Sequence, residues 1–452
     1  MTAKDSAEEA YSQGVLALRS GLMGDAIDAW RRATDIDPLH ESARYNLAVA
    51  MALRGDNDAA VSNYEKLLTI NPAHREGLFN LANIMYRRGQ LQTASALYGR
   101  LVDAHPRYAA GWINLAKSLS DSGELERSGV ALKQAILLEP DNIVAHWNLS
   151  HVLLAEKKWL EAWKEYEWRL VLPEWMKPPV DAPAWNVNRK PGRVLLWNDQ
   201  GVGDAIQFLR YPRFLVNLGF EPWLMVQDNL KRIASSVAGI AGVLGPSDPL
   251  PKFDYQAPLL SMPHLLSLPD PSMFVGTAYL KPERAMDLPK RPGRLAVGIA
   301  WAGNANFEKD EDRSAALSEL MPLFSVPNID WFSLQVGDAS AQISECELSG
   351  CVLNLAACFN DFADTAAAIA ALDLVISVDT AVAHLAGAMN VPCWLMLSDA
   401  CDWRWRGEEN SSVWYHSMRI FRQKNPKDWN SVAKEMAAEL KKHNQSNSKS
   451  SD

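Results

Sequence analysis

Three stretches in the second half of the chain combine acids, amides, hydroxyls and glycines in patterns suited to group transfer. The first, residues 197–207, reads WNDQGVGDAIQ and places Asp204 in a glycine-rich turn directly after an apolar run. A carboxylate held at such a strand-to-helix turn can act as a general base for an acceptor hydroxyl. The alternative is that Asp204 is a helix N-terminal acid favoured by the helix dipole. A dinucleotide-binding turn is not expected, because GxGxxG would need glycine at Ile206.

The second stretch, residues 301–306, reads WAGNAN and again follows an apolar run. Gly303 and Asn304 lie in this loop, and Arg313 and Ser314 follow shortly after it. Backbone amides and a guanidinium supply the donors and positive charge that suit a diphosphate. The alternative is a solvated loop without a ligand. Gln335, at the end of a later apolar run, is predicted to belong to the same donor-binding group.

The third stretch, residues 376–388, reads ISVDTAVAHLAGA. Asp379 and Thr380 are good N-cap residues, and the small-residue helix that follows would begin at Ala381. Free amides at such a helix start form a ready phosphate site. His384 lies about one turn further on, where it could reach a phosphate or a sugar, or else pack as a core residue. We predict that all four side chains belong to the donor site.

A fourth stretch mixes aromatic rings with charge. Residues 402–405 read DWRW, and residues 414–423 add Trp, Tyr and two Arg. Such a mixture is typical of a base or sugar pocket, and equally of a plug between domains. Both interpretations stay open from the sequence.

One asparagine recurs every 34 residues in the first third of the chain, and each is followed by leucine. A glycine that ends a first helix, a small residue inside a second and a proline that closes the unit share this period. The four columns are Asn46, Asn80, Asn114 and Asn148; Gly21, Gly55, Gly89 and Gly123; Ala26, Ala60, Ala94 and Ser128; and Pro38, Pro72, Pro106 and Pro140. This is the tetratricopeptide pattern, and it predicts about five helical pairs over residues 7–171.

The asparagine column is the predicted acceptor-binding feature. Identical positions of stacked repeats line one continuous surface. A row of amides on a concave surface can hydrogen-bond the backbone of an extended peptide. The alternative is a row of solvated polar positions. Ser12 occupies the equivalent place in the first repeat, so the predicted track covers repeats two to five.

The elements that must position the chemistry follow the repeats. A connector rich in proline and tryptophan covers residues 172–191. Short apolar runs between helical segments then predict parallel strands covered on both faces. The runs are residues 194–197, 223–226, 295–301, 331–335, 352–355, 374–378 and 394–397. A seam rich in Pro, Arg and Lys at residues 281–294 separates an N-terminal half, residues 192–285, from a C-terminal half, residues 292–442. Two such halves would enclose a cleft at the carboxyl ends of their strands.

Composition narrows the class of protein. The chain of 452 residues is 48% apolar and 22% charged, which is ordinary for globular domains. Its net charge of −9 argues against nucleic acid as the main partner. The start of the chain has no apolar signal region, and no run approaches the length of a membrane helix. Five cysteines without metal-type spacing predict reduced thiols in a cytoplasm. Residues 443–452 are predicted to be a disordered tail.

These motifs carry a family resemblance. Residues 7–171 resemble tetratricopeptide repeats, and residues about 192–442 resemble the glycosyltransferase family 9 superfamily, which includes the heptosyltransferases. The matching motifs are the Gly203–Asp204 turn, the Gly303 loop and the run from Asp379 to His384. The resemblance implies the GT-B architecture: two Rossmann-like α/β halves with a cleft between them, a donor nucleotide held mainly by the C-terminal half, inversion at the anomeric carbon and no metal.

The resemblance also assigns roles by position. Asp204 matches the proposed base, and Thr380, Ala381 and His384 match the donor diphosphate site. Arg313 matches the basic residue after the second loop only approximately. Heptosyltransferases usually have glycine where this chain has Ala381, a departure that bears on the identity of the donor.

The whole arrangement resembles bacterial repeat-containing glycosyltransferases, some of which are implicated in glycosylating flagellin. It also parallels the eukaryotic O-GlcNAc transferases, whose repeat groove carries an asparagine ladder that grips the acceptor. We therefore expect a cytoplasmic, metal-independent, inverting glycosyltransferase without a cofactor, whose partners are a nucleotide-sugar and an acceptor polypeptide. The alternatives are a transferase that builds surface polysaccharide, and a non-catalytic repeat adaptor or chaperone.

Overall fold

A computed structural model describes residues 3–172, 175–268, 270, 276–305, 310–399, 401–407 and 409–449. The chain divides into two compact units, Met1–Glu156 and Lys157–Asp452. The boundary lies 15 residues before the end of the predicted repeat region at 171, so the fifth predicted helical pair is shared between the two units.

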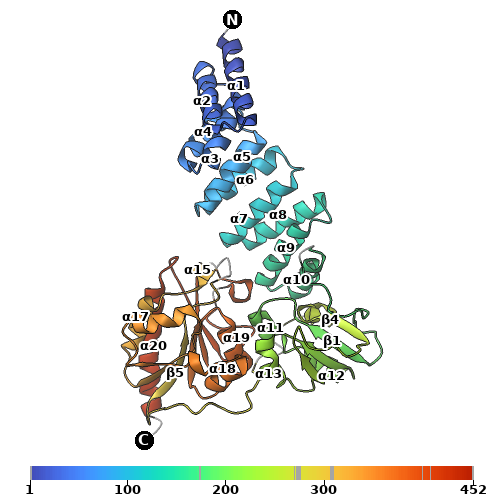
Figure 1. Cartoon of the computed structure of the whole chain (residues 1–452), viewed down its shortest axis with the longest axis vertical. Coiled ribbons are helices and arrows are strands. Elements are labelled where there is room, and N and C mark those ends of the chain that lie inside the picture. The colour runs from blue at the N-terminus through green and yellow to red at the C-terminus, as the bar shows by residue number, and fades with distance from the viewer. Residues whose placement is uncertain are drawn as a thin grey trace. The chain divides into compact units, whose positions relative to one another are not determined.

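The first unit consists of helices arranged as successive antiparallel pairs (Figure 1). They are α1 (Ala3–Arg19), α2 (Met23–Ile36), α3 (Glu41–Leu53), α4 (Asn57–Ile70), α5 (Arg75–Arg87), α6 (Leu91–Ala104), α7 (Ala109–Asp121), α8 (Leu125–Leu138) and α9 (Ile143–Ala155). The predicted columns explain the pairing. Each column glycine has φ between 73° and 83°, so the chain turns in the left-handed region where glycine carries no Cβ penalty.

The small-residue column lets paired helices approach closely. Ala26, Ala60, Ala94 and Ser128 are all completely buried. Ser128 compensates for its buried hydroxyl by donating to the carbonyl of Ala116 at 2.7 Å. The repeat geometry thus follows from residues that the period had singled out.

The second unit contains two parallel sheets, ordered β3-β2-β1-β4 and β10-β9-β8-β5-β6-β7. The strands are β1 (Arg193–Trp197), β2 (Glu221–Met225), β3 (Gly242–Leu244), β4 (Tyr255–Pro258), β5 (Leu295–Ala300), β6 (Ile329–Ser333), β7 (Val352–Asn354), β8 (Leu374–Val378), β9 (Cys393–Leu397) and β10 (Met418–Arg422). All seven predicted strands are present, within about two residues at their ends. The assignment of the two sheets to the GT-B architecture stays a prediction.

Three strands were missed because they lack an apolar run. The short β3 contains Gly242, β4 ends in Pro258, and β10 at the sheet edge reads MRIFR. β10 nevertheless buries Met418, Ile420 and Phe421. Pattern alone misses such strands, since their pairing with a neighbour supplies the stability.

Helices cover both sheets of the second unit. They are α10 (Trp159–Tyr166), α11 (Val202–Phe208), α12 (Pro212–Asn217), α13 (Lys231–Ala234), α14 (Met262–Leu265), α15 (Asp310–Arg313), α16 (Met321–Phe324), α17 (Gln342–Glu345), α18 (Phe362–Ile369), α19 (Ala381–Ala388) and α20 (Trp429–Lys449). Short 3₁₀ helices are η1 (Glu167–Val171), η2 (Asp228–Leu230), η3 (Leu259–Ser261), η5 (Leu317–Leu320), η6 (Asp338–Ala341), η7 (Ala356–Cys358) and η8 (Trp403–Trp405). α20, η5 and α16 pack on one face of the larger sheet and complete its core. Among the described helices, none is long and apolar enough to cross a membrane.

The structure differs from the predicted tail. α20 continues to Lys449, seven residues into the segment predicted to be disordered, and residues 450–452 lie outside the described part. The amphipathic start of α20 is anchored by buried Trp429, Val432, Met436 and Leu440. Helix propagation from this anchored segment needs no further apolar residues.

Candidate functional site

Two of the predicted donor-side stretches meet at the switch point of the larger sheet. From β5 the chain proceeds through β6 and β7 on one side, and through β8, β9 and β10 on the other. The register pairs Ala300 with Ser377, so β5 and β8 end side by side. The Gly303 loop follows β5, and the start of α19 follows β8. Ligands of open α/β sheets bind at this kind of position, outside the carboxyl ends of the strands.

The Gly303 loop is held by the residues predicted to share its site. The Gly303 amide donates to Ser314 Oγ at 2.8 Å, and this hydroxyl donates to Asp310 Oδ2 at 2.9 Å. Arg313 Nε donates to the other carboxylate oxygen at 2.9 Å. A Cβ at Gly303 would lie 2.3 Å from Asp310 Oδ1, so glycine is required for this close approach. Asn304 is exposed beside it, and Asn306 lies outside the described residues.

Gln335 supports this loop instead of facing a ligand. Its side chain is only 4% exposed, and Oε1 accepts from the amides of Trp301 at 3.0 Å and Ala302 at 2.9 Å. Its Nε2 donates to the Val336 carbonyl at 3.1 Å. The predicted donor-binding role is therefore corrected to a positioning role, since both ends of this amide are used by the backbone.

The start of α19 is open in the way the sequence suggested. Thr380 is the N-cap residue in an extended conformation, with φ −140° and ψ 173°, and its hydroxyl makes no capping hydrogen bond. That hydroxyl instead lies 3.2 Å from Ser377 Oγ. Burial, and then the negative charge of Asp402, raise the pKa of the neighbouring Asp379 to about 6.

His384 is both packed and part of the site. Its Nδ1 lies 2.9 Å from the Tyr415 hydroxyl, and its Nε2 lies 3.9 Å from Asp379 Oδ1. Burial, and then the positive charge of Arg404, lower its pKa well below the ordinary value, so the imidazole is neutral at physiological pH. A neutral His384 can exchange hydrogen bonds with a ligand but does not supply a positive charge.

The Gly203–Asp204 turn comes from the other sheet and meets α19. α11 and α19 lie side by side in the second unit (Figure 1). A Cβ at Gly203 would lie 3.0 Å from His384 Cδ2 and 3.8 Å from the Cα of Ala381. The first and third predicted stretches therefore converge, although about 180 residues separate them in sequence.

Asp204 has both carboxylate oxygens engaged. Oδ2 accepts from the Gly201 amide at 3.2 Å, which closes the first turn of α11, and Oδ1 is hydrogen-bonded by Arg404 Nη2. Burial raises the pKa of Asp204, and Arg404 opposes this shift. The structure thus contains the helix N-terminal acid that the alternative interpretation described, together with an ion pair that was not predicted.

Arg404 and Arg169 are the site residues that the sequence analysis missed. Arg404 was noted only as part of the DWRW stretch, because its partner Asp204 lies 200 residues away. Arg169 in η1 is completely buried and donates from Nε to Asp199 Oδ2 at 2.8 Å and from Nη2 to Ser261 Oγ at 2.9 Å. Asp199 follows β1 in the first motif, which was the available signal.

Aromatic packing resolves part of the open question about the fourth stretch. Trp403 and Trp414 make edge contacts with Trp163 and Trp159 of α10, with ring centroids 5.9 and 5.5 Å apart. These rings act as the plug, whereas Arg404 in the same stretch reaches the site. The predicted packing role of the two α10 tryptophans agrees with these contacts.

The four column asparagines lie one each on α3, α5, α7 and α9, and all are half-buried. Asn80 Nδ2 donates to the Tyr64 hydroxyl at 3.1 Å, and Asn114 Nδ2 donates to the Ala110 carbonyl at 2.9 Å. Each of these amides keeps its oxygen and a second N–H for another partner. Peptide binding by the column stays a prediction.

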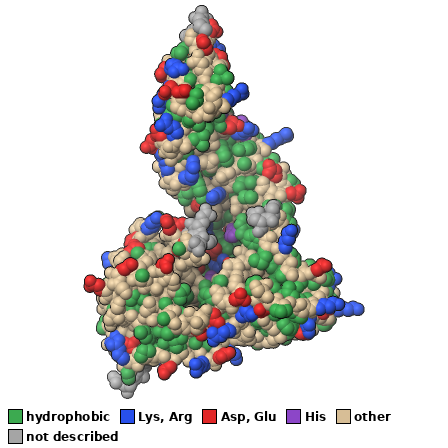
Figure 2. Space-filling view, viewed as in Figure 1, with side chains coloured by type: hydrophobic (Ala, Val, Ile, Leu, Met, Phe, Trp, Pro, Cys, Tyr) green, Lys and Arg blue, Asp and Glu red, His purple; other side chains and the backbone are tan. Residues whose placement is uncertain are grey.

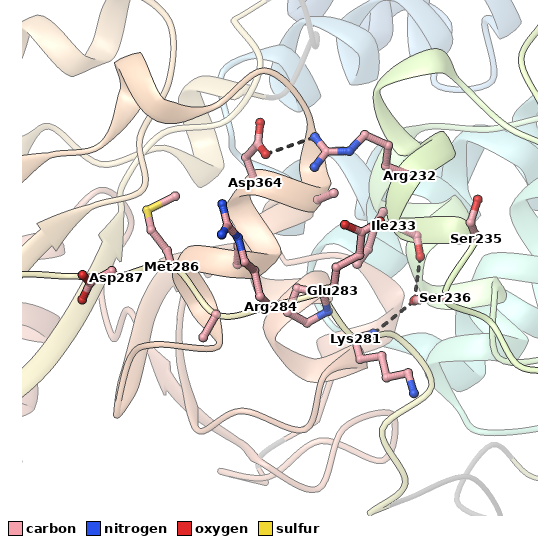
Figure 3. A pocket seen from close by; sticks show the side chains of 14 residues that line it. Arg232, Ile233, Ser235, Ser236, Lys281, Glu283, Arg284, Met286, Asp287 and Asp364 are labelled. Carbon is pink, nitrogen blue, oxygen red and sulfur yellow. Dashed lines mark hydrogen bonds and ion pairs between the residues drawn. The ribbon is translucent and has the colours of Figure 1, made fainter.

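A cavity of about 650 Å³ lies apart from the predicted site. It opens between α13, α18 and residues 281–287, and Figure 3 shows charged side chains of both signs around it. Arg232 donates to Asp361 and Asp364, each at 3.0 Å, and so ties α13 to α18 across the two halves. None of the predicted site residues lines this cavity.

Two broader observations concern charge and metal. Basic and acidic side chains are interspersed over the visible face of the molecule (Figure 2). In the described part of the chain, no three His, Cys, Asp or Glu side chains form a group that could hold a metal ion.

Comparison with known proteins identifies the first unit. Three family models described as tetratricopeptide repeat match residues 11–75, 51–119 and 109–142. The helical unit carries tetratricopeptide repeats. This agrees with the 34-residue columns and the left-handed glycine turns.

A curated relative extends further along the chain. Protein FlbA of Caulobacter vibrioides is 25% identical over 307 residues, which cover 60% of this chain and 50% of FlbA. The chain thus spans about half the length of the curated relative that it matches.

Solved structures resemble about a third of the chain. MamA from Desulfovibrio magneticus RS-1 is 21% identical, with 36% of this chain and 92% of that chain covered and a TM-score of 0.33. YrrB, described as a TPR protein with an unusual peptide-binding site, is 14% identical, with 35% and 83% covered and a TM-score of 0.33. PilF of Pseudomonas aeruginosa is 19% identical, with 37% and 77% covered and a TM-score of 0.32.

Proposed function

We propose that this protein is an inverting glycosyltransferase that moves a sugar from a nucleotide-sugar donor to a Ser or Thr hydroxyl of a polypeptide bound by its repeats. One observation carries the proposal: a carboxylate-bearing turn from one parallel sheet meets an open helix start at the switch point of the other. Gly203 permits this approach to Ala381 and His384. Such an arrangement can hold an acceptor hydroxyl and a donor phosphate on opposite sides of one reacting carbon.

The donor diphosphate would bind at the start of α19 and the Gly303 loop. The free amides at Thr380 and Ala381 carry the partial positive charge of a helix N-terminus. Arg313 adds a full positive charge, and neutral His384 can donate a hydrogen bond to a phosphate oxygen. These groups would stabilise the negative charge that develops on the leaving phosphate.

The reaction is a single displacement. The acceptor oxygen forms a bond to the anomeric carbon while the bond from that carbon to the phosphate oxygen breaks. The hydroxyl proton passes to Asp204, and the nucleoside diphosphate leaves with the electron pair of the broken bond. Attack opposite to the leaving group inverts the configuration.

The acceptor would be an extended polypeptide along the asparagine column, with flagellin as a candidate that the family resemblance suggests. Amide side chains can pair with any peptide backbone, so they bind without reading a particular side chain. Retention of two free hydrogen-bonding groups on Asn80 and Asn114 supports this role.

A donor screen and an intact-mass assay test the proposal together. A nucleotide-sugar at 100 times its dissociation constant adds roughly 2.7 kcal/mol, which raises the melting temperature by several degrees. The screen covers CMP-, UDP-, GDP- and ADP-linked sugars, and the donor that binds is then incubated with candidate polypeptides. We expect a mass increase of one sugar, which Asp204→Ala abolishes while leaving donor binding nearly intact. A mass increase only on a glycan acceptor would favour the polysaccharide alternative instead.

A repeat adaptor without catalysis is the second candidate. The observation that favours it is the engagement of both Asp204 oxygens, by Gly201 and Arg404. If no donor raises the melting temperature and no acceptor gains mass, the adaptor function replaces the transferase.

A further inference from the structure

Asp204 lacks a free proton-accepting position in the structure. One oxygen accepts from the Gly201 amide and the other from Arg404. A general base must accept the proton of its substrate on an available lone pair with suitable geometry. Either Asp204 is a structural residue, or one of its partners leaves when substrate binds.

Arg404 is the partner that is able to leave. The Gly201 amide belongs to the same turn as Asp204, whereas Arg404 reaches it from η8 in the other half. Its side chain is 7% exposed, and Nη1 donates to Asp402 Oδ1 at 2.9 Å, within its own segment. Nε donates to Gln207 of α11, and the guanidinium lies 4.2 Å from the Trp403 ring centroid. The bond to Asp402 and the stacking can persist while the bonds to α11 break.

The donor site lies within electrostatic reach of the same guanidinium. Arg404 lowers the pKa of both Asp379 and His384, which flank the open start of α19. A diphosphate bound there would present several anionic oxygens, and arginine binds phosphate in the same forked manner as carboxylate. Phosphate and Asp204 would therefore compete for one cation.

We infer that Arg404 is a donor-operated shield: it blocks Asp204 in the unoccupied protein and turns to the diphosphate when donor binds, which frees Asp204 to act as the base. The inference rests on the proposed function. It orders the reaction, because Asp204 becomes available only after the donor is in place. An enzyme of this kind does not deprotonate an acceptor, or admit water as one, in the absence of donor.

Proton linkage reports the exchange directly. Loss of the Arg404 charge from its side raises the pKa of Asp204, so the protein takes up protons as the diphosphate binds. Other groups face Asp204 and its partner and contribute their own uptake or release. They are Asp402 beside η8, Asp199 after β1, Tyr166 of α10, and Asp379 and His384 at α19. The comparison of wild type with Asp204→Asn isolates the share of Asp204.

The experiment titrates the full chain with UDP, ADP, GDP, CDP and inorganic pyrophosphate in a calorimeter, in buffers of different ionisation enthalpy between about pH 5 and 7. We expect greater proton uptake in wild type than in Asp204→Asn. Arg404→Gln should weaken binding about 10- to 100-fold by loss of charge-assisted hydrogen bonds. Arg404→Lys should recover part of this loss, and Arg193→Gln, which breaks an ion pair with Glu221 elsewhere, should bind as wild type does.

Three results would overturn the shield: equal proton uptake in wild type and Asp204→Asn, unchanged affinity in Arg404→Gln, or no binding of any of these anions. The Asp204→Asn comparison does not depend on whether the Arg404 variants fold. Proton uptake that depends on Asp204, without sugar transfer from any donor, would support the shield and reject the transferase. Transfer that Arg404→Gln leaves unimpaired would do the reverse.

Discussion

At the scale of single residues, burial decides what each charge contributes. Arg169 and Asp199 are buried together, and Trp175 Nε1 adds a third hydrogen bond to the carboxylate at 3.2 Å. A buried pair of this kind is costly to break, because the remaining charge has no water and no partner. Residue types in the first motif suggested Asp199 as a neighbour of the site, but nothing local pointed to Arg169.

Arg169→Met is expected to destabilise the second unit by about 3–5 kcal/mol, because it leaves Asp199 as an uncompensated buried charge. Arg193→Met is the control, since it removes a half-exposed pair with Glu221 and should cost at most about 1 kcal/mol. Urea unfolding followed by tryptophan fluorescence measures both. Equal midpoints for the two variants would contradict the claim that the Arg169 pair supports the fold.

Asp379 predicts a pH dependence of stability. Its pKa of about 6 in the folded protein lies above the ordinary value near 4, so the folded state binds more protons than the unfolded state in between. The free energy of unfolding therefore falls as pH rises from about 4 to about 6, and the loss is complete above 6. Asp379→Asn should remove this slope and raise stability at neutral pH by about 2 kcal/mol.

Asp330 is the matched control for that pH dependence. Burial opposes its ionisation, but hydrogen bonds from Arg291 and Arg294 are stronger and lower its pKa. Asp330→Asn should therefore lose stability at neutral pH, and the difference from wild type should vanish as pH falls below the ordinary aspartate value. Urea midpoints measured across the acid range for both variants distinguish the two signs.

At the scale of elements, the turn glycines of the repeats were fully predictable. The 34-residue spacing assigns them to helix ends, and the structure places every one in the left-handed region. The missed strands β3, β4 and β10 show the limit of the same approach, because their stability comes from neighbouring strands. Gln335 shows it too: its position at the carboxyl end of a strand suggested a ligand, but the loop after β5 takes both ends of its amide.

Two glycines of one repeat test this assignment. Gly89 has φ of 73°, so Gly89→Ala should cost about 1–2 kcal/mol in the first unit. Gly99 lies inside α6 with open space around its missing Cβ, so Gly99→Ala should stabilise by about 0.5–1 kcal/mol. Circular dichroism melts of both variants read out the two signs. A destabilising Gly99→Ala would mean that α6 is packed more tightly than the structure shows.

At the scale of the whole molecule, the two units divide the proposed task between acceptor and donor. The repeats would select the polypeptide, and the α/β unit would supply the chemistry. Binding energy can therefore be changed in one unit without changing the other, since sites without shared partners behave independently.

The double variant Asn80→Ala, Asn114→Ala tests that division. Loss of two amides should weaken binding of an acceptor polypeptide by about 1–3 kcal/mol, or roughly 5- to 150-fold, and leave the donor melting shift unchanged. Asn63→Ala in α4, which removes an amide bonded within its own helix, is the control. Fluorescence anisotropy with a labelled acceptor measures the difference. Unaltered affinity would place the acceptor elsewhere.

Local pattern was sufficient for the repeats, their turns, seven parallel strands and the approximate place of the site. These features depend on periods of a few residues or on a repeat of 34, which any single stretch displays. Only the folded chain revealed that Arg404 closes on Asp204, that Arg169 is buried against Asp199, and that Gln335 serves the Gly303 loop. The physical reason is that these contacts join residues 30 to 200 positions apart, and their geometry depends on how strands order and helices pack.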